Sequence, residues 1–384
     1  MNLEGELVVH LPWDGHHVQR ATVRSSRPFA AARVLAGKRP AQVVETVPML
    51  FSVCGGAQRA AAANVLAASG AAEVASSRSS DELGIVLETV QEGFWRVLID
   101  WPQAMGRQGL ATPVATARHR IAAAARGRDG ALAWEDATAM RELGEALGAI
   151  AAKSIYGVSP AEWLALGDVV SLQAWLERGA TLPAVLLQEL LEQMPHLGRS
   201  DVALMPPTAP DALIRAVVPA MTCEPAFARA PTWAGVPVET GALARMRTQP
   251  LVAALADRYG NSVVTRLVAR LAELATLLDE LAKGPREDAT PPRVHAFALA
   301  AGEGLAAVQT ARGLLLHRAR VADGRVVDYQ IVAPTEWNFH PDGALVRGLD
   351  GLAADDLGAV EQWARLAVQA LDPCVECRIE IGHA

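Results

Sequence analysis

The sequence predicts an α+β protein that is mainly helical, with small β hairpins near the N-terminus and in the C-terminal quarter. Aromatic side chains make up only 5% of the 384 residues, whereas alanine, leucine and valine are abundant. Alanine favours helix and lets helix backbones approach closely. Apolar residues recur at helical spacing through most of the middle of the chain, and β-type runs flank the Asp-Gly pairs at Asp14-Gly15 and Asp323-Gly324. These patterns indicate a large helical core with two hairpins.

The N-terminal part of the chain predicts a hairpin followed by helices, the second of which begins beside a cysteine. The paired glycines Gly55 and Gly56 permit a tight backbone after Cys54. We therefore expect Cys54 at a helix N-terminus, where the helix dipole favours a thiolate. The predicted elements are strands at 5–11 and 17–23, a helical stretch at 27–50 interrupted at Gly37 and Pro40, and an alanine-rich helix at 59–68.

The rest of the chain predicts a run of helices and a second hairpin. A proline-rich passage at 205–237 is expected to be irregular, and Cys223 within it is interpreted as structural. Helices are expected from a cap at Asp81 to Leu98, and at 112–126, 134–155, 160–178, 182–194, 262–281 and 355–370, with hairpin strands at 314–321 and 325–332 and a surface loop up to Pro292.

Composition excludes several classes of partner. A net charge of -7 offers no basic patch for nucleic acid. No apolar run approaches the roughly 18 residues needed to cross a bilayer, so we expect no membrane partner and a cytoplasmic protein. Four widely spaced cysteines do not resemble a disulfide framework. Because we find no repeat and no domain boundary, we expect one interlocked unit over residues 1–384.

A Cys-x-x-Cys pair in the segment 371–377 is the strongest chemical signal. Two thiols at this spacing form a metal clamp or a redox pair. Redox pairs normally follow a strand and open a helix, whereas Cys374 and Cys377 follow a predicted helix, which favours metal. The only other thiols, Cys54 and Cys223, are distant in sequence, so a metal site must join opposite ends of the chain or receive a metal that brings its own ligands. A pair of small buried hydrophobic residues remains the alternative.

Read together, six segments of the chain resemble the large subunit of nickel-iron hydrogenases. Taken alone, Arg312 would be interpreted as an ordinary surface arginine, but here it belongs to one of these segments. They are Leu3-Glu4-Gly5; Cys54-Gly55; the stretch 231–246; Arg312-Gly313; Tyr329-Gln330 with the stretch 332–338 (Val-Ala-Pro-Thr-Glu-Trp-Asn); and residues 372–377 (Asp-Pro-Cys-Val-Glu-Cys). The resemblance implies a large-subunit-like helical core.

In that family four cysteines hold a nickel bridged to an iron that carries two cyanides and one carbon monoxide. By resemblance, Cys54 and Cys374 match terminal nickel ligands and Cys377 matches one bridging cysteine. The other bridging position is Ala57, which cannot bind metal. The family's two histidines near these cysteines fall on Ala61 and Glu380, and both departures argue against hydrogen catalysis.

The iron pocket of the family is better preserved than its nickel site. Arg312 and Thr335 match positions whose donors hydrogen-bond the cyanide nitrogens, and the resemblance places Pro334 in the same pocket. Glu4 matches a proton-relay carboxylate of the catalytic relatives, but we favour a structural role for it because a relay matters only where turnover occurs.

A large-subunit-like chain that keeps the iron pocket but lacks one bridging thiol most resembles the HupK/HoxV hydrogenase-maturation proteins. The resemblance implies a scaffold, not an enzyme, that transiently holds iron with two cyanide and one carbon monoxide ligands, with little or no nickel. The implied partners are the maturation chaperones that assemble and deliver the iron fragment, and the hydrogenase large-subunit precursor. Two alternatives remain: a divergent catalytic large subunit with three cysteines, and a metal-free interaction module of the same fold, as in the related quinone-oxidoreductase subunit.

Overall fold

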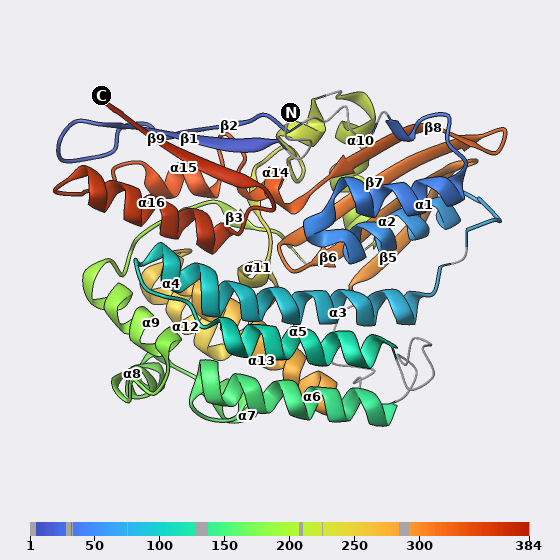
Figure 1. Ribbon diagram of the computed structural model, residues 1–384. Helices are drawn as coiled ribbons and strands as arrows, with labels where there is room; N and C mark the ends of the chain where they lie inside the picture. Colours follow the sequence, from blue (N-terminus) through green and yellow to red (C-terminus); the bar gives the residue numbers. More distant parts are fainter. Residues whose placement is uncertain are drawn as a thin grey trace.

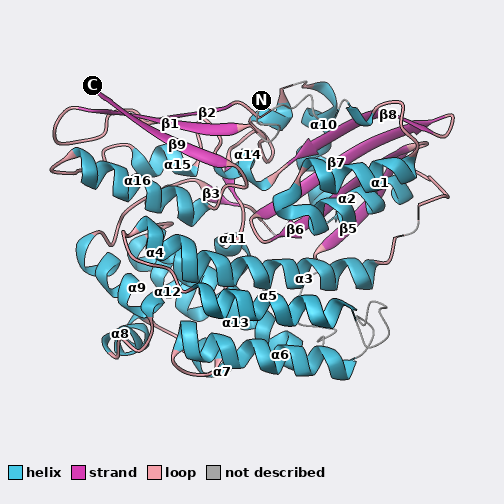
Figure 2. Ribbon diagram, in the orientation of Figure 1, coloured by secondary structure: helices cyan, strands magenta, loops and turns pink. Residues whose placement is uncertain are grey.

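A helical bundle makes up one half of the molecule, and two larger β-sheets with their own helices make up the other (Figures 1 and 2). A third sheet pairs only the short strands β3 (Ala203–Leu204) and β4 (Val238–Glu239), in parallel. The computed structural model describes residues 5–27, 32, 34–74, 76–126, 137–206, 210–224, 226–283 and 292–383. Helix is the main regular structure, which confirms the predicted α+β class. Glu4 and the predicted loop at 285–291 lie outside the described residues.

The centre of the bundle is α13 (Val263–Lys283), which confirms the long helix predicted at 262–281. It is buried on nearly every side because other helices surround it. Close packing against α6 depends on Gly144, where a Cβ atom would lie 2.4 Å from the backbone nitrogen of Ala282. The other helices of the bundle are α3 (Arg78–Trp95), α4 (Trp101–Ala104), α5 (Ala111–Arg126), α6 (Ala137–Ala151), α7 (Pro160–Leu164), α8 (Val169–Glu177), α9 (Leu182–Gln193), α11 (Ala242–Met246) and α12 (Pro250–Tyr259).

Several predicted helix boundaries differ from the observed ones for local reasons. The helix expected at 160–178 is two helices, because the Asp168 side chain accepts a hydrogen bond from the Ser171 backbone and starts α8 anew. The cap expected at Asp81 is wrong: α3 begins at Arg78, and Asp81 accepts a hydrogen bond from Asn64. Of the helical stretch expected at 27–50, the described residues before Pro40 show only 3-10 helix, at 32 and 34–35, and α1 (Pro40–Leu50) begins at its proline.

A four-stranded antiparallel meander forms the larger sheet, in the order β5-β6-β7-β8. The pairing of β7 (Gly313–Ala322) with β8 (Arg325–Val332) confirms the second predicted hairpin. The sequence did not reveal β5 (Val294–Ala300) or β6 (Glu303–Thr310). In β6 both faces are buried, so the strand lacks the alternation of a half-exposed strand.

Helices cover both faces of this sheet. On one face α1 and α2 (Gly55–Ala68) pack against Ala306, Ala319 and Tyr329. On the other face lies α10 (Pro210–Cys223), whose Leu213 and Val217 contact the sheet core. The expectation that 205–237 is irregular is therefore wrong over α10, because its apolar residues recur at helical spacing despite the prolines.

The smaller sheet joins the two ends of the chain, in the order β2-β1-β9. The antiparallel pairing of β1 (Glu6–Trp13) with β2 (Thr22–Ser25) confirms the first predicted hairpin. The sequence did not reveal β9 (Glu376–His383), which pairs in parallel with β1 over its whole length. Because β9 follows α16 (Leu357–Leu371) after a short link, this pairing fixes the Cys-x-x-Cys segment beside the N-terminal strand.

Candidate metal centre

The predicted site residues come from four separate elements that meet between the two sheets and the bundle. Cys54 directly precedes α2, as predicted. Arg312 occupies the turn between β6 and β7, and Thr335 lies in the first turn of α14 (Pro334–Asn338), which the buried Pro334 begins. Cys374 lies in the link between α16 and β9.

Cys54 and Cys374 line one small cavity of about 10 Å³, together with Arg27 and Phe51. This volume is about the minimum that one water molecule needs. Cys54 is buried and Cys374 is partly buried. The fold therefore brings together two thiols from opposite ends of the chain, as the sequence predicts for a metal site.

Hydrogen bonds hold both sulfurs in place. The Thr335 hydroxyl donates to Cys374 Sγ at 3.0 Å and accepts from the Cys374 backbone N–H at 3.1 Å. The Gln58 side-chain amide donates to Cys54 Sγ at 3.7 Å. Each sulfur thus faces a donor, which suits a thiolate because a thiolate only accepts hydrogen bonds.

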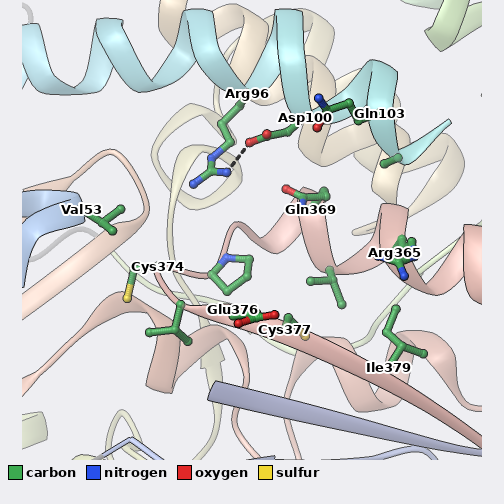
Figure 3. A pocket seen from close by; sticks show the side chains of 14 residues that line it. Val53, Arg96, Asp100, Gln103, Arg365, Gln369, Cys374, Glu376, Cys377 and Ile379 are labelled. Carbon is green, nitrogen blue, oxygen red and sulfur yellow. Dashed lines mark hydrogen bonds and ion pairs between the residues drawn. The ribbon is translucent and has the colours of Figure 1, made fainter. Parts of the chain in front are cut away.

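Cys377 lies apart from the small cavity. It belongs to β9, and with Cys374 it lines a larger pocket of about 430 Å³. Figure 3 shows Cys374 and Cys377 on opposite sides of Glu376 along the pocket wall. As the side chains stand, no cluster of three or more His, Cys, Asp or Glu that could hold a metal ion occurs in the part of the chain that the structure describes.

Burial keeps two of these cysteines protonated in the metal-free chain. Burial and the nearby Cys374 raise the pKa of Cys54 to about 12, although Arg312 opposes the shift. Burial likewise raises the pKa of Cys377 to about 12, with a smaller opposing effect of Arg365. The expectation that the helix dipole makes Cys54 a thiolate is therefore wrong without metal, because desolvation outweighs the dipole.

Two buried arginines stand beside the pair formed by Cys54 and Cys374. Arg27 lines the small cavity, and its guanidinium lies 2.8 Å from the carboxylate of Glu336. Arg312 is 2% exposed, and its Nη2 lies 2.6 Å from Glu92. Burial would lower the pKa of each arginine, but the carboxylates and both thiols outweigh burial and raise it. No sequence pattern pointed to Arg27, since its partner is 309 positions away.

Asp372 anchors the Cys-x-x-Cys segment through charge. Its side chain is fully buried and lies 2.8 Å from Arg96, 2.8 Å from Arg270 and 3.4 Å from Arg312. Burial alone would raise the pKa of Asp372, yet the arginines lower it to about 2. The residue has a left-handed backbone with φ 56° and ends α16. The carboxylate therefore ties the start of this segment to α3, α13 and the arginine turn.

The larger pocket connects the cysteines with the protein surface. Arg96 and Asp100 line it from the π-helical segment that continues α3, Gln103 lines it from α4, and Arg365 and Gln369 line it from α16 (Figure 3). Arg96 and Asp100 form an ion pair across its wall. The pocket offers a polar approach to Cys374, and it is far larger than the cavity at Cys54.

Two further positions from the sequence analysis, Ala57 and Cys223, do not line the cavity that Cys54 and Cys374 share. Ala57 is fully buried and packs against Ile85 and Ala333 in a small apolar cluster. The backbone N–H groups of Gly56 and Ala57 donate to Glu88. Cys223 is exposed at the end of α10, so the structure does not support its interpretation as a buried structural residue.

Comparison with known proteins identifies relatives of the whole chain. The family model for nickel-dependent hydrogenases matches residues 222–380. The hydrogenase expression/formation protein HoxV of Cupriavidus necator is 31% identical over 94% of this chain and 93% of its own. The hydrogenase expression/formation protein HupK of Azotobacter vinelandii is 31% identical over 100% of both chains.

Among solved structures, the fold resembles Ni-Fe-Se hydrogenases. The enzyme from D. vulgaris Hildenborough in its as-isolated oxidized state matches with a TM-score of 0.56 at 17% identity, over 94% of each chain. A reduced, active form from Desulfomicrobium baculatum matches with a TM-score of 0.52 at 16% identity, over 95% of each chain. At this identity the likeness shows the shared fold alone. None of the helices in the described ranges combines the length and apolar character that a membrane span requires.

Proposed function

The chain belongs to the family of HupK- and HoxV-type hydrogenase expression/formation proteins, and from this premise we propose that it is a maturation scaffold for the nickel-iron active site. Its cargo is iron with two cyanide ligands and one carbon monoxide, held until transfer to the hydrogenase large-subunit precursor. The proposed partners are that precursor and the chaperones that assemble and deliver the iron fragment, in the cytoplasm. We propose no catalytic turnover on this chain.

The observation that carries the proposal is a pair of thiols with two buried arginines nearby. Cys54 and Cys374 line one cavity with Arg27, and Arg312 is close enough to affect the pKa of Cys54. Thiolates are soft ligands that suit low-valent iron. Guanidinium groups supply charge-assisted hydrogen bonds to anions such as cyanide. The Thr335 hydroxyl already donates to Cys374 Sγ at 3.0 Å, and can hold that ligand in position.

Ligand number supports iron over nickel. The diatomic ligands already fill three positions on the iron, so one or two thiolates complete its binding. Nickel in the catalytic relatives requires four thiolates, and here Ala57 leaves at most three. Cys377 is the proposed third thiol, and it lines the larger pocket beside Cys374. Weak retention of nickel and a single bridge to iron favour release of the fragment.

The test is infrared spectroscopy and elemental analysis of protein produced anaerobically with its maturation partners. We expect cyanide and carbonyl bands, stoichiometric iron and little nickel. Cys54→Ser and Cys374→Ser should remove the bands and block hydrogenase maturation while the protein stays folded, because an alcohol is a poor ligand for this iron. Cys377→Ser tests the third thiol, and the exposed Cys223→Ser is the control.

Two results would overturn the proposal. Stoichiometric nickel beside iron would revive a catalytic large subunit. Normal maturation after loss of both C-terminal thiols would favour a metal-free interaction module instead.

A further inference from the structure

We propose that a buried relay of hydrogen bonds from Tyr329 through His317 and Gln58 sets Cys54 to act as a thiolate ligand. These three side chains are positioning residues, since Gln58 alone contacts the thiol. The relay's hydrogen-bond polarity follows from the structure of the metal-free chain, whereas its effect on bound iron rests on the proposed function above.

The relay runs without interruption from the larger sheet to the thiol. The Tyr329 hydroxyl lies 2.7 Å from His317 Nδ1. His317 Nε2 lies 2.9 Å from Gln58 Oε1, and Gln58 Nε2 lies 3.7 Å from Cys54 Sγ. Gln58 and His317 are 0% exposed and Tyr329 is 6% exposed. Because water is excluded, the four groups must satisfy one another.

Only one polarity gives every strong hydrogen-bonding group a partner, and the group that it leaves over is the S–H of protonated Cys54, which is a weak donor. Burial lowers the pKa of His317 to about 3, so the imidazole is neutral and carries one N–H. If that proton is on Nε2, it donates to Gln58 Oε1, and the Tyr329 hydroxyl donates to Nδ1. The Gln58 amide N–H group is then directed at Cys54 Sγ, which accepts.

The reverse polarity leaves a donor without an acceptor. With the proton on Nδ1, His317 would donate to the Tyr329 oxygen, and Gln58 would have to turn its amide so that its oxygen faces the sulfur. The described residues offer the Tyr329 hydroxyl no second partner, so among them its proton would have no acceptor. An unsatisfied buried donor is costly, and the forward polarity wins.

The forward polarity matches the ligand form of the cysteine, which Cys54 takes only once a metal is bound. A sulfur that receives a hydrogen bond is best matched by a thiolate, which has no proton of its own to place. Metal binding requires the thiolate. Tyr329 and His317 thus fix the amide of Gln58 in the orientation that a metal-bound Cys54 needs, in the way that outer partners orient metal ligands.

The polarity is testable on the full chain without iron. Protein labelled with ¹⁵N-histidine, with the His317 signals assigned by their loss in His317→Gln, should show a neutral ring protonated at Nε2. Tyr329→Phe should shift the Nδ1 signal, because its donor is gone. A ring protonated at Nδ1, or an imidazolium at neutral pH, would overturn the proposal.

The effect on iron is read from the infrared bands of anaerobically loaded protein. Gln58→Leu should move the carbonyl band to lower wavenumber, because a thiolate that has lost its hydrogen bond donates more electron density to iron. Tyr329→Phe should move it in the same direction by less. The matched control is Tyr156→Phe, which removes a buried tyrosine hydrogen bond of 2.8 Å to the Leu271 carbonyl in the bundle and should leave the band in place.

The two readouts separate the possible failures. If the wild type shows the bands and Gln58→Leu, Tyr329→Phe and the control all show them at the same wavenumbers, the relay is overturned while the scaffold function stands. Absence of bands in every protein, wild type included, would overturn the scaffold function, and the histidine spectra would then decide the relay by themselves.

Discussion

Replacing Asp372 by asparagine should destabilise the metal-free protein strongly. Asparagine keeps the size of the side chain and tolerates the left-handed backbone at φ 56°, so the substitution changes mainly the charge. It leaves Arg96 and Arg270, each 2.8 Å from the lost carboxylate, and Arg312 at 3.4 Å. Three buried cations then lack their shared counter-ion.

The structure sets the size of the effect. Removing one partner of a buried ion pair typically costs about 3–5 kcal/mol. The lowering of the Asp372 pKa from 3.8 to about 2 corresponds to about 2.5 kcal/mol of stability at neutral pH. The value of about 2.5 kcal/mol covers only the part of the Asp372 contribution to stability that is linked to its protonation. We therefore expect Asp372→Asn to lose about 3–5 kcal/mol at pH 7.

The pH dependence follows from the sign of the shift. The folded pKa lies below the unfolded one, so the carboxylate stabilises the fold above pH 3.8, and this stabilisation is lost as the pH falls through about 2. Urea unfolding of both proteins, followed by circular dichroism, measures the difference. The difference in free energy of unfolding between wild type and Asp372→Asn should have its full value at neutral pH and should decrease as the pH falls from about 3.8 to about 2.

A matched control separates buried from exposed charge. Asp201 forms an ion pair of 2.9 Å with Arg347, but its side chain is 80% exposed. Water screens such a pair, so Asp201→Asn should leave the free energy of unfolding nearly unchanged. If Asp372→Asn costs no more than this control, the buried arginines do not depend on Asp372, and the proposed anchoring of the cysteine segment is refuted.

Four further substitutions test other parts of the fold by the same unfolding assay. Thr335→Val removes both hydrogen bonds to Cys374 and should cost about 1–3 kcal/mol; an unchanged midpoint would mean that these bonds are dispensable. Gly144→Ala places a methyl 2.4 Å from α13 and should cost about 1–3 kcal/mol. Gly148→Ala on the same helix meets nothing within 4 Å and should gain about 0.5–1 kcal/mol, and equal effects of the two would refute the close-packing argument. Cys223→Ser should stay within about 0.5 kcal/mol of wild type, because the side chain is exposed, and a larger loss would reveal an unrecognised contact.

Local patterns predicted the elements whose environment is visible in the sequence. The apolar stripe of α13 and the Asp-Gly turn between β7 and β8 are examples, since helical spacing and a two-residue turn are short-range signals. In contrast, β6 is buried on both faces and β9 pairs with a strand at the other end of the chain. Neither property leaves a mark that reading a short window can recognise.

The same distinction holds for the site. The resemblance to a known family pointed to Cys54, Cys374, Thr335 and Arg312, which the fold brings into one region. It did not reveal Arg27, because the charge that retains it belongs to Glu336 and only the tertiary fold brings the two together. Nor could spacing show that Cys377 lies outside the small cavity, since that depends on the start of β9.

The parallel pairing of β1 with β9 also determines when the site can exist during folding. Within the site, the contacts Arg312–Glu92, His317–Gln58 and Arg27–Glu336 join residues that are 220, 259 and 309 positions apart in the sequence. Closing the first loop of this length costs roughly 5 kcal/mol of chain entropy, and such non-local contacts form slowly. The helices can gather from short-range contacts beforehand, whereas the two thiols meet only after the ends of the chain have paired. If the chain holds iron as proposed, a partly folded copy should not bind the iron fragment, because its two thiols have not yet met.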